Sequence, residues 1–289
     1  MLLLALLGAL LTLLAGQALK VRSDRLWLAG FTERLLEHAD SVAATTHLTL
    51  GQLRMTRTAA CSDEDLAYLR IVAFNSRFLR DVDRLHDGAI TCSATWGRFV
   101  PPRPMPPPNL THGRMHWWTA IRDPAEPRLV ADFAAFGDAF VVTSPTAFDS
   151  YAHIDPDIGA LVVTRDGGHR YRTFGQTDRM VQDAAEADYG LGSVRHARMC
   201  SRDYDLCVVT RMRRSSLLEQ SLPASVGLCL LGGLVGGGAG VARMLYRRYR
   251  RSLPVQLRRA LARDGLTMHY QPLRRIADRS LVGAEVLAR

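Results

Sequence analysis

Two apolar runs flank the central segment of the chain, and the first of them contains no charged residue. The first, residues 2–19, is mostly leucine and alanine, and the second covers about residues 222–245. Each run has about the 20 residues that a helix needs to cross a bilayer. We therefore predict transmembrane helices over residues 1–20 and 219–245. A cleaved signal peptide is the alternative for the first run, but no cationic residue precedes its apolar stretch.

The segment between the runs, residues 21–215, opens with a helical pattern. Apolar residues recur there near helical spacing, at Phe31, Leu35, Val42, Leu50 and Leu53. This pattern predicts that the first helix continues outward as an amphipathic stalk. Ser62, followed by Asp63, Glu64 and Asp65, has the composition of an N-cap with an acidic first turn. A second helix is predicted from there to about Phe74.

Short β-rich runs separated by turn residues follow this second helix. Asp87-Gly88 and Asp166-Gly167-Gly168 each lie between two candidate strands. The proline-rich stretch Pro101–Pro108 is predicted to be an extended connector or surface loop. His112 and His116 lack acidic neighbours and a helical context, so we interpret them as ordinary structural residues rather than metal ligands. The predicted fold is an α+β sensor domain between two transmembrane helices.

The charge of the chain indicates its orientation in a membrane. The formal net charge is +9, and nearly all the basic residues are arginine, with Lys20 the single lysine. A dense arginine cluster, residues 243–251, directly follows the second apolar run. By the positive-inside tendency this cluster places the C-terminal end in the cytoplasm and the central segment outside. No helix-turn-helix or base-stacking module accompanies the charge, so nucleic acid is not an expected partner.

Four of the five cysteines fall in the segment that this topology places outside. They are Cys61, Cys92, Cys200 and Cys207, while Cys229 lies in the second apolar run. An even count in an oxidising compartment favours disulfides over zinc, although three connectivities are possible. Pairing of nearest neighbours would tie Cys61 to Cys92 and Cys200 to Cys207. Cys61 immediately precedes a helix start, which favours a reactive thiolate, so a redox-responsive bond and a permanent structural bridge both stay open.

The C-terminal end consists of a helical linker, residues 246–263, and the beginning of another domain, residues 264–289. Strand-like patterns cover Met268–Pro272 and Leu281–Arg289. Glu285 is a single carboxylate within the second pattern and is a possible metal ligand. The residues alone leave the function of this end open.

A resemblance adds to this reading. The Ala-Leu-Ala-Arg helix end, Tyr270-Gln271-Pro272 and the run from Gly283 to Arg289 resemble the opening of the EAL family of cyclic-di-GMP phosphodiesterases. Two apolar helices around a domain with Cys61-Ser62-Asp63, and a second cysteine about thirty residues later, resemble the CSS-motif subgroup of that family. Here the EAL triplet reads Glu-Val-Leu, and Asp63 replaces the second serine of the CSS motif.

The resemblance implies a membrane-bound, redox-responsive phosphodiesterase in the bacterial inner membrane, with a periplasmic sensor and a cytoplasmic C-terminus. Glu285 would bind Mg²⁺ or Mn²⁺, and Gln271, Leu287 and Arg289 would contact cyclic-di-GMP. The periplasmic disulfide-forming machinery would act on the cysteines. A homodimer would couple sensor and enzyme, and small-residue spacings in Gly233–Gly237 are typical of dimerising membrane helices.

The resemblance also implies that the sequence covers only the start of the EAL domain. A TIM-type barrel takes roughly 250 residues, and the sequence ends at Arg289. We therefore expect an incomplete TIM-barrel-like domain that does not catalyse hydrolysis by itself. The alternative interpretation is a noncatalytic membrane sensor or a decaying, truncated gene product.

Overall fold

The computed structural model describes residues 2–122, 130–152, 155–177, 180, 194–213, 222–262 and 267–288. It divides into two compact units. One is Lys20–Ser216, called the central domain below, and the other combines residues 1–19 with 217–289. The predicted boundaries at 215, 219, 263 and 264, and the predicted site residue Arg289, lie outside the described residues.

Helix α1 (Leu2–Met55) is continuous from the first apolar run into the central domain. All five residues of the predicted stalk stripe, from Phe31 to Leu53, are buried, and this confirms the stalk. Within the described residues, α1 and α4 (Leu222–Arg250) are long and apolar enough to cross a membrane. The leucines of residues 2–19 are largely exposed, as expected of a surface that faces lipid.

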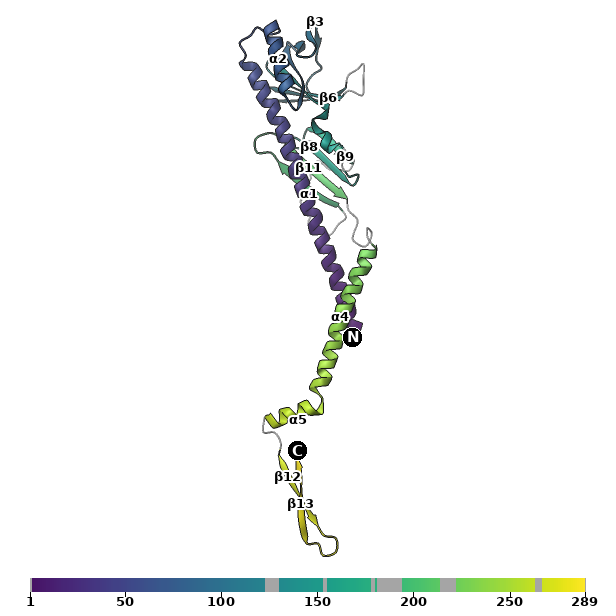
Figure 1. Ribbon diagram of the computed structural model, residues 1–289. Helices are drawn as coiled ribbons and strands as arrows, with labels where there is room; N and C mark the ends of the chain where they lie inside the picture. The colour runs from purple at the N-terminus through teal and green to yellow at the C-terminus, as the bar shows by residue number, and fades with distance from the viewer. Residues whose placement is uncertain are drawn as a thin grey trace. The chain divides into compact units, whose positions relative to one another are not determined.

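Helix α2 (Asp63–Asn75) begins where the sequence predicts. The Ser62 side chain accepts a hydrogen bond from the Asp65 backbone N–H at 3.1 Å, which satisfies one of the free donors of the first turn. Figure 1 shows α2 beside the end of α1 that is distant from the N-terminus. The cap fixes the point at which the chain leaves the loop of residues 56–62, called the Cys61 loop below, and becomes helical.

The central domain contains two antiparallel sheets. The larger has the order β3-β2-β1-β7-β6-β5-β4 and the smaller the order β10-β11-β8-β9. The larger sheet is built from β1 (Leu79–His86), β2 (Ala89–Ser93), β3 (Gly97–Pro104), β4 (Leu110–His112), β5 (Met115–Arg122), β6 (Val130–Phe136) and β7 (Ala139–Thr143). The smaller is built from β8 (Ile158–Val163), β9 (Arg170–Gly175), β10 (Val194–Cys200) and β11 (Cys207–Arg213), and a 3-10 helix, η1 (Pro145–Tyr151), lies between the two sets.

Local sequence explains the hairpins and one departure. Asp87 and Gly88 both adopt positive φ in the β1–β2 turn, and Gly167 does so between β8 and β9, so both predicted turns are confirmed. The prediction of a connector over Pro101–Pro108 is wrong for its first half, because residues 101–104 belong to β3. Since β3 is an edge strand, its prolines remove no ladder hydrogen bond that an inner strand would need.

Helix α1 supplies the core of both sheets. Leu28, Leu35 and Val42 of α1 pack with η1 and with residues of β8 and β11. Leu50 and Leu53 pack with α2 and with the first strands of the larger sheet. The hydroxyls of Thr32 and Thr210 also form a buried hydrogen bond of 2.6 Å between α1 and β11. One helix therefore packs against both sheets (Figure 1).

The second unit is a close helix pair followed by α5 (Leu253–Ala262) and a hairpin of β12 (Met268–Arg274) and β13 (Leu281–Ala288). A Cβ added at Gly232 would collide with the Gly8 backbone, and one added at Gly236 would collide with that of Leu4. The Thr12 hydroxyl lies 2.9 Å from the Leu228 carbonyl, which accepts its hydrogen bond. Small residues of α4 thus pack against α1 of the same chain, and the homodimer stays a prediction.

We predict that cysteines replacing Ala5 and Gly237 form a disulfide within one chain. A Cβ on Gly237 would lie 3.8 Å from the Ala5 Cβ, close to the separation of about 3.8 Å in disulfides. With Cys229→Ser as background, mild oxidation should remove two sites for a maleimide mass tag from the monomer. Gly232→Ile should prevent the bond, and Gly238→Ile should not, because a Cβ there meets nothing within 4 Å. A crosslinked dimer in place of the modified monomer would contradict the pairing.

Strand β1 carries two buried carboxylates on one face. Asp81 accepts hydrogen bonds from the Ser93 hydroxyl at 2.6 Å and the Val82 N–H at 2.9 Å. Asp83 is 3% exposed, and its Oδ1 has no hydrogen-bond partner among the described residues. Burial, and then the nearby charge of Asp81, raise the pKa of Asp83 well above its usual value. The folded domain therefore holds the proton of Asp83 at pH values where the unfolded chain releases it.

Asp83→Asn should stabilise the domain at pH 7.5 by about 1 kcal/mol. In the wild type, stability falls as the pH rises above the unfolded pKa of about 4 and stops falling only above the raised folded pKa. The amide does not ionise, so its advantage should vanish near pH 3. Thermal unfolding followed at both pH values measures this difference. Asp87→Asn is the control, because that side chain is 90% exposed, and an equal effect of both substitutions would refute the explanation.

Candidate functional site

The disulfide between Cys61 and Cys92 joins the loop before α2 to the larger sheet. The two Cα atoms are 5.8 Å apart. Cys61 has a positive φ of 62° and is half-buried, whereas Cys92 in β2 is fully buried. A thiol or thiolate from solvent therefore reaches the Cys61 sulfur more readily than the Cys92 sulfur.

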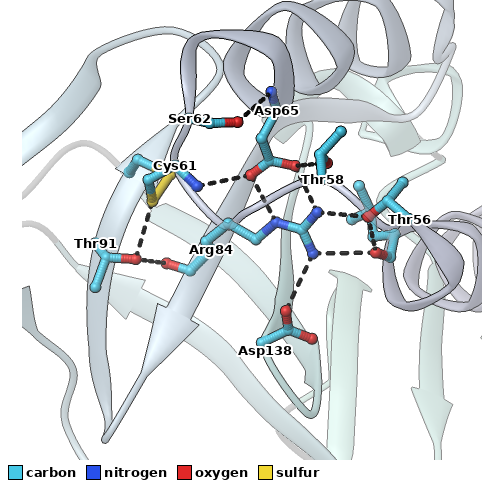
Figure 2. Close-up of polar contacts among 10 residues, drawn as sticks. Thr56, Thr58, Cys61, Ser62, Asp65, Arg84, Thr91 and Asp138 are labelled. Atoms are coloured by element: carbon cyan, nitrogen blue, oxygen red, sulfur yellow. Dashed lines mark hydrogen bonds and ion pairs between the residues drawn. A yellow bond between two sulfur atoms is a disulfide. The ribbon is translucent and has the colours of Figure 1, made fainter.

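A buried ion pair lies directly beside this disulfide. Asp65 accepts a hydrogen bond from the Cys61 backbone N–H at 2.9 Å and binds the Arg84 guanidinium through both carboxylate oxygens, at 2.6 and 3.0 Å. The side chains of Asp65 and Arg84 are 0% and 3% exposed. Figure 2 shows the guanidinium of Arg84 and the backbone N–H of Cys61 both directed at the carboxylate of Asp65. Bidentate pairing of this kind fixes geometry as well as charge.

The same guanidinium reaches the end of α1. It donates to the Leu53 carbonyl at 3.0 Å and to the Thr56 hydroxyl at 2.8 Å, and it pairs with Asp138 at 3.2 Å. Leu53 lies in the last turn of α1, where carbonyls lack helical partners and a cation is favourable. Arg84 thus connects α1, the Cys61 loop and the β6–β7 turn (Figure 2).

The electrostatics keep this pair ionised. Burial alone would raise the pKa of Asp65, but the hydrogen bonds from Arg84 and from the Cys61 N–H outweigh it, so the pKa is lowered. Burial likewise opposes the charge of Arg84, and Asp65 outweighs it, so the pKa of Arg84 is raised. Because the folded pKa of Asp65 lies below its unfolded value, the pair stabilises the fold above about pH 4 and loses this effect as the pH falls through the folded pKa.

Exposed contacts of Arg98 and half-buried contacts of Thr91 complete the site. Arg98 of β3 donates to the Cys61 carbonyl at 2.8 Å and pairs with Asp63 at 2.6 Å. The Thr91 hydroxyl lies 3.3 Å from the Cys61 sulfur and donates to the Arg84 carbonyl at 3.2 Å. Every backbone polar group of Cys61 is therefore held by a side chain that follows it in the sequence.

The second disulfide has a different setting. Cys200 and Cys207 are directly opposite each other in the β10–β11 hairpin, with Cα atoms 3.9 Å apart. The bond staples the base of the hairpin, as the nearest-neighbour pairing would require. Arg165 donates to the Ser201 carbonyl at 2.6 Å at this end of the hairpin. Tyr204, in the loop that this disulfide closes, meets His47 of α1 with ring centroids 5.1 Å apart, but no ion pair like that of Arg84 joins this loop to α1 among the described residues.

The residues predicted from the EAL resemblance lie in the other unit. Gln271 of β12 is directly opposite Glu285 of β13, and Leu287 follows on the same face because strand side chains alternate. All three are exposed, and Arg289 lies outside the described residues. No group of three or more Cys, His, Asp or Glu side chains suited to a metal occurs among the described residues. One carboxylate does not make a two-metal centre, so the described residues do not form that site.

Comparison with known protein families identifies the family to which the central domain belongs. A family model described as the CSS motif domain associated with EAL matches residues 27–222. The chain belongs to the CSS-motif family. This match covers the α1 stalk, both sheets and both disulfides of the CSS-motif domain. No curated protein matches the chain.

Sequence reasoning found the cysteines of the CSS-motif domain but not the residues that hold them. Arg84 and Asp138 are 19 and 73 residues from Asp65, and nothing local marks them. Asp65 was expected only as one of three acidic residues in a first helical turn. The sequence offers one signal, which is the position of Arg84 within a candidate strand before Asp87-Gly88. An arginine that such a strand buries requires a charged partner.

We predict that Arg84→Met destabilises the CSS-motif domain by about 3–5 kcal/mol, because removal of one partner leaves Asp65 charged and buried. Arg98→Met removes an exposed pair and should cost below about 1 kcal/mol. Thermal unfolding of the two variants, with both disulfides intact, measures the difference. Equal losses would show that Arg84 is not the residue on which the loop depends.

Proposed function

We propose that this CSS-motif chain is the sensor and membrane portion of a redox-responsive cyclic-di-GMP phosphodiesterase. The observation that carries the proposal is the link from the Cys61–Cys92 disulfide through Asp65 and Arg84 to the end of α1. Because α1 continues into the first apolar run, a change at the disulfide acts on the helix that enters the membrane.

The proposed topology places the CSS-motif domain in the periplasm of a bacterial inner membrane and the residues after α4 in the cytoplasm. The arginine-rich end of α4 supports this orientation. Two disulfides support an oxidising compartment for the central domain. The membrane itself, and the periplasmic disulfide-forming machinery, are the partners that this orientation requires.

The proposed switch is thiol–disulfide exchange at Cys61. A thiolate of a reduced partner attacks the Cys61 sulfur and displaces the Cys92 thiolate, and the second thiol of the partner then releases Cys61. Two electrons pass from the partner dithiol, which becomes a disulfide, to the Cys61–Cys92 bond, which becomes two thiols. Release of the loop removes a constraint on Asp65. The oxidised and reduced domains then favour different packings of α1, separated by a few kcal/mol.

The proposed output is hydrolysis of cyclic-di-GMP to the linear dinucleotide by an EAL domain that β12 and β13 begin. The hairpin supports this role because Gln271 and Glu285 are cross-strand neighbours, so residues of the two motifs meet on one face. Glu285 would provide one ligand to Mg²⁺ or Mn²⁺, with Gln271, Leu287 and Arg289 near the substrate. An exposed two-stranded hairpin is marginal alone, which is why the proposal requires further strands and, for coupling, a homodimer.

A chimera tests the sensor role. Residues 1–289 are joined in frame to the remainder of a complete EAL domain, and hydrolysis of cyclic-di-GMP is measured in membrane vesicles with and without dithiothreitol. We expect reductant to change the rate by about five-fold or more. Paired serine substitutions at Cys61 and Cys92 should give, with or without dithiothreitol, the rate that the wild-type chimera shows in dithiothreitol.

The paired serine substitutions at Cys200 and Cys207 are the matched control, and they should leave the response to reductant intact. Export and folding of each variant are checked by protease protection. Rates that are independent of reductant in the wild-type chimera would reject redox control. A chimera without hydrolysis under any condition, although its EAL domain is active in another context, would favour a noncatalytic membrane sensor.

A further inference from the structure

A cavity of about 280 Å³ lies in the CSS-motif domain, away from the Cys61–Cys92 disulfide. It is bounded by α1, by strands β4 to β9, by η1 and by the β10–β11 connection. Its volume is close to the lower end of the range for ligand sites, about 300 Å³. The interior is mostly apolar, with Val42, Phe148, Val162 and Leu206 among its lining residues.

Aromatic rings form one side of this cavity. The rings of Trp117 and Tyr171 meet edge to face with centroids 6.0 Å apart. His47 of α1 lies 5.8 Å from the Trp117 ring and 5.1 Å from the Tyr204 ring. All four side chains line the cavity. Faces of aromatic rings carry negative electrostatic potential, so a group of such rings attracts a cation.

The carboxylates at the edge of the cavity also favour a cation. Arg172 pairs with Asp132 at 2.8 Å, and its buried Nε has no hydrogen-bond partner among the described residues. Asp203 and Asp205 also line the cavity and are exposed at its edge. Burial lowers the pKa of His47, which keeps this imidazole neutral near pH 7. Among the described lining residues the carboxylates outnumber the single guanidinium of Arg172, and an anionic ligand would meet the carboxylates of the rim.

We propose that this cavity is a binding site for a small organic cation, an ammonium group attached to a compact apolar body. Asp203, Asp205 and the ring faces hold the ammonium group, and the apolar interior holds the body. Desolvated contacts between cations and aromatic rings are worth about 2 kcal/mol. A neutral molecule of the same shape gains only the burial of its apolar surface.

The site goes beyond the proposed redox function because it is a second input to the same helix. Ala39, Val42, Thr46 and His47 of α1 line the cavity, and the Arg84 link lies further along α1, at Leu53. A ligand that fills the cavity therefore contacts the helix that the disulfide also constrains. Binding at this site does not require an active EAL domain.

Isothermal titration of the full chain in lipid nanodiscs tests the proposal with three probes of similar shape. They are phenethylammonium, the neutral 2-phenylethanol and the anionic 3-phenylpropionate. We expect phenethylammonium to bind at least five-fold more tightly than 2-phenylethanol and 3-phenylpropionate to bind most weakly. Equal affinities, preference for the anion, or no binding by phenethylammonium would overturn the proposal.

Variants locate the binding. Trp117→Leu should weaken binding of phenethylammonium about five- to thirty-fold, whereas Trp96→Leu should not, because Trp96 is 76% exposed in the β2–β3 turn. The double variant Asp203→Asn and Asp205→Asn should weaken binding of phenethylammonium and leave that of 2-phenylethanol unchanged. Thermal unfolding of each variant verifies its fold. Unchanged affinity for phenethylammonium in the folded double variant would place the ammonium group elsewhere and overturn the assignment.

Discussion

The contacts of the Arg84 guanidinium are the interactions on which the rest of the CSS-motif domain depends. It neutralises Asp65, satisfies the Leu53 carbonyl at the end of α1 and contacts Asp138 in a turn of the larger sheet. A buried cation of this kind is costly unless every donor is used. Here the donors reach three separate segments of the chain, so the pairing is satisfied only when helix, loop and sheet are assembled together.

This constraint separates the two disulfides. Cys200–Cys207 closes a hairpin whose strands already pair along their length, so the bond reinforces an existing register. Cys61–Cys92 closes a loop of irregular backbone against a strand, and the Cys61 N–H is bound by the carboxylate that Arg84 holds. A bond in the first setting adds local stability. A bond in the second setting is linked through Asp65 and Arg84 to the end of α1, so the proposed redox change would act on that helix.

The sequence was sufficient to predict several helices and turns, but it was insufficient to predict the contacts between them. The apolar stripe of α1, the N-cap at Ser62 and the turn at Asp87-Gly88 each follow from local rules. The Arg84–Asp65 pair and the lining of the cavity bring together residues from distant segments. The periodicity of the sequence does not predict such long-range contacts. Residues 101–104 form an edge strand although their prolines are equally typical of a connector, and the composition does not distinguish the two until the sheet order is known.

The position of α1 would allow one helix to combine the two proposed inputs. The cavity contacts α1 at residues 39–47, and Arg84 contacts it at Leu53, while the apolar part of the same helix packs against α4. If a cation in the cavity and the disulfide favour different packings of α1, each must change the free energy of the other by the same amount, because coupling between two sites is reciprocal. A ligand that binds more tightly to the oxidised domain then makes the disulfide harder to reduce. Redox poise and ligand concentration would therefore act on a single equilibrium of the helix, and neither would act independently of the other.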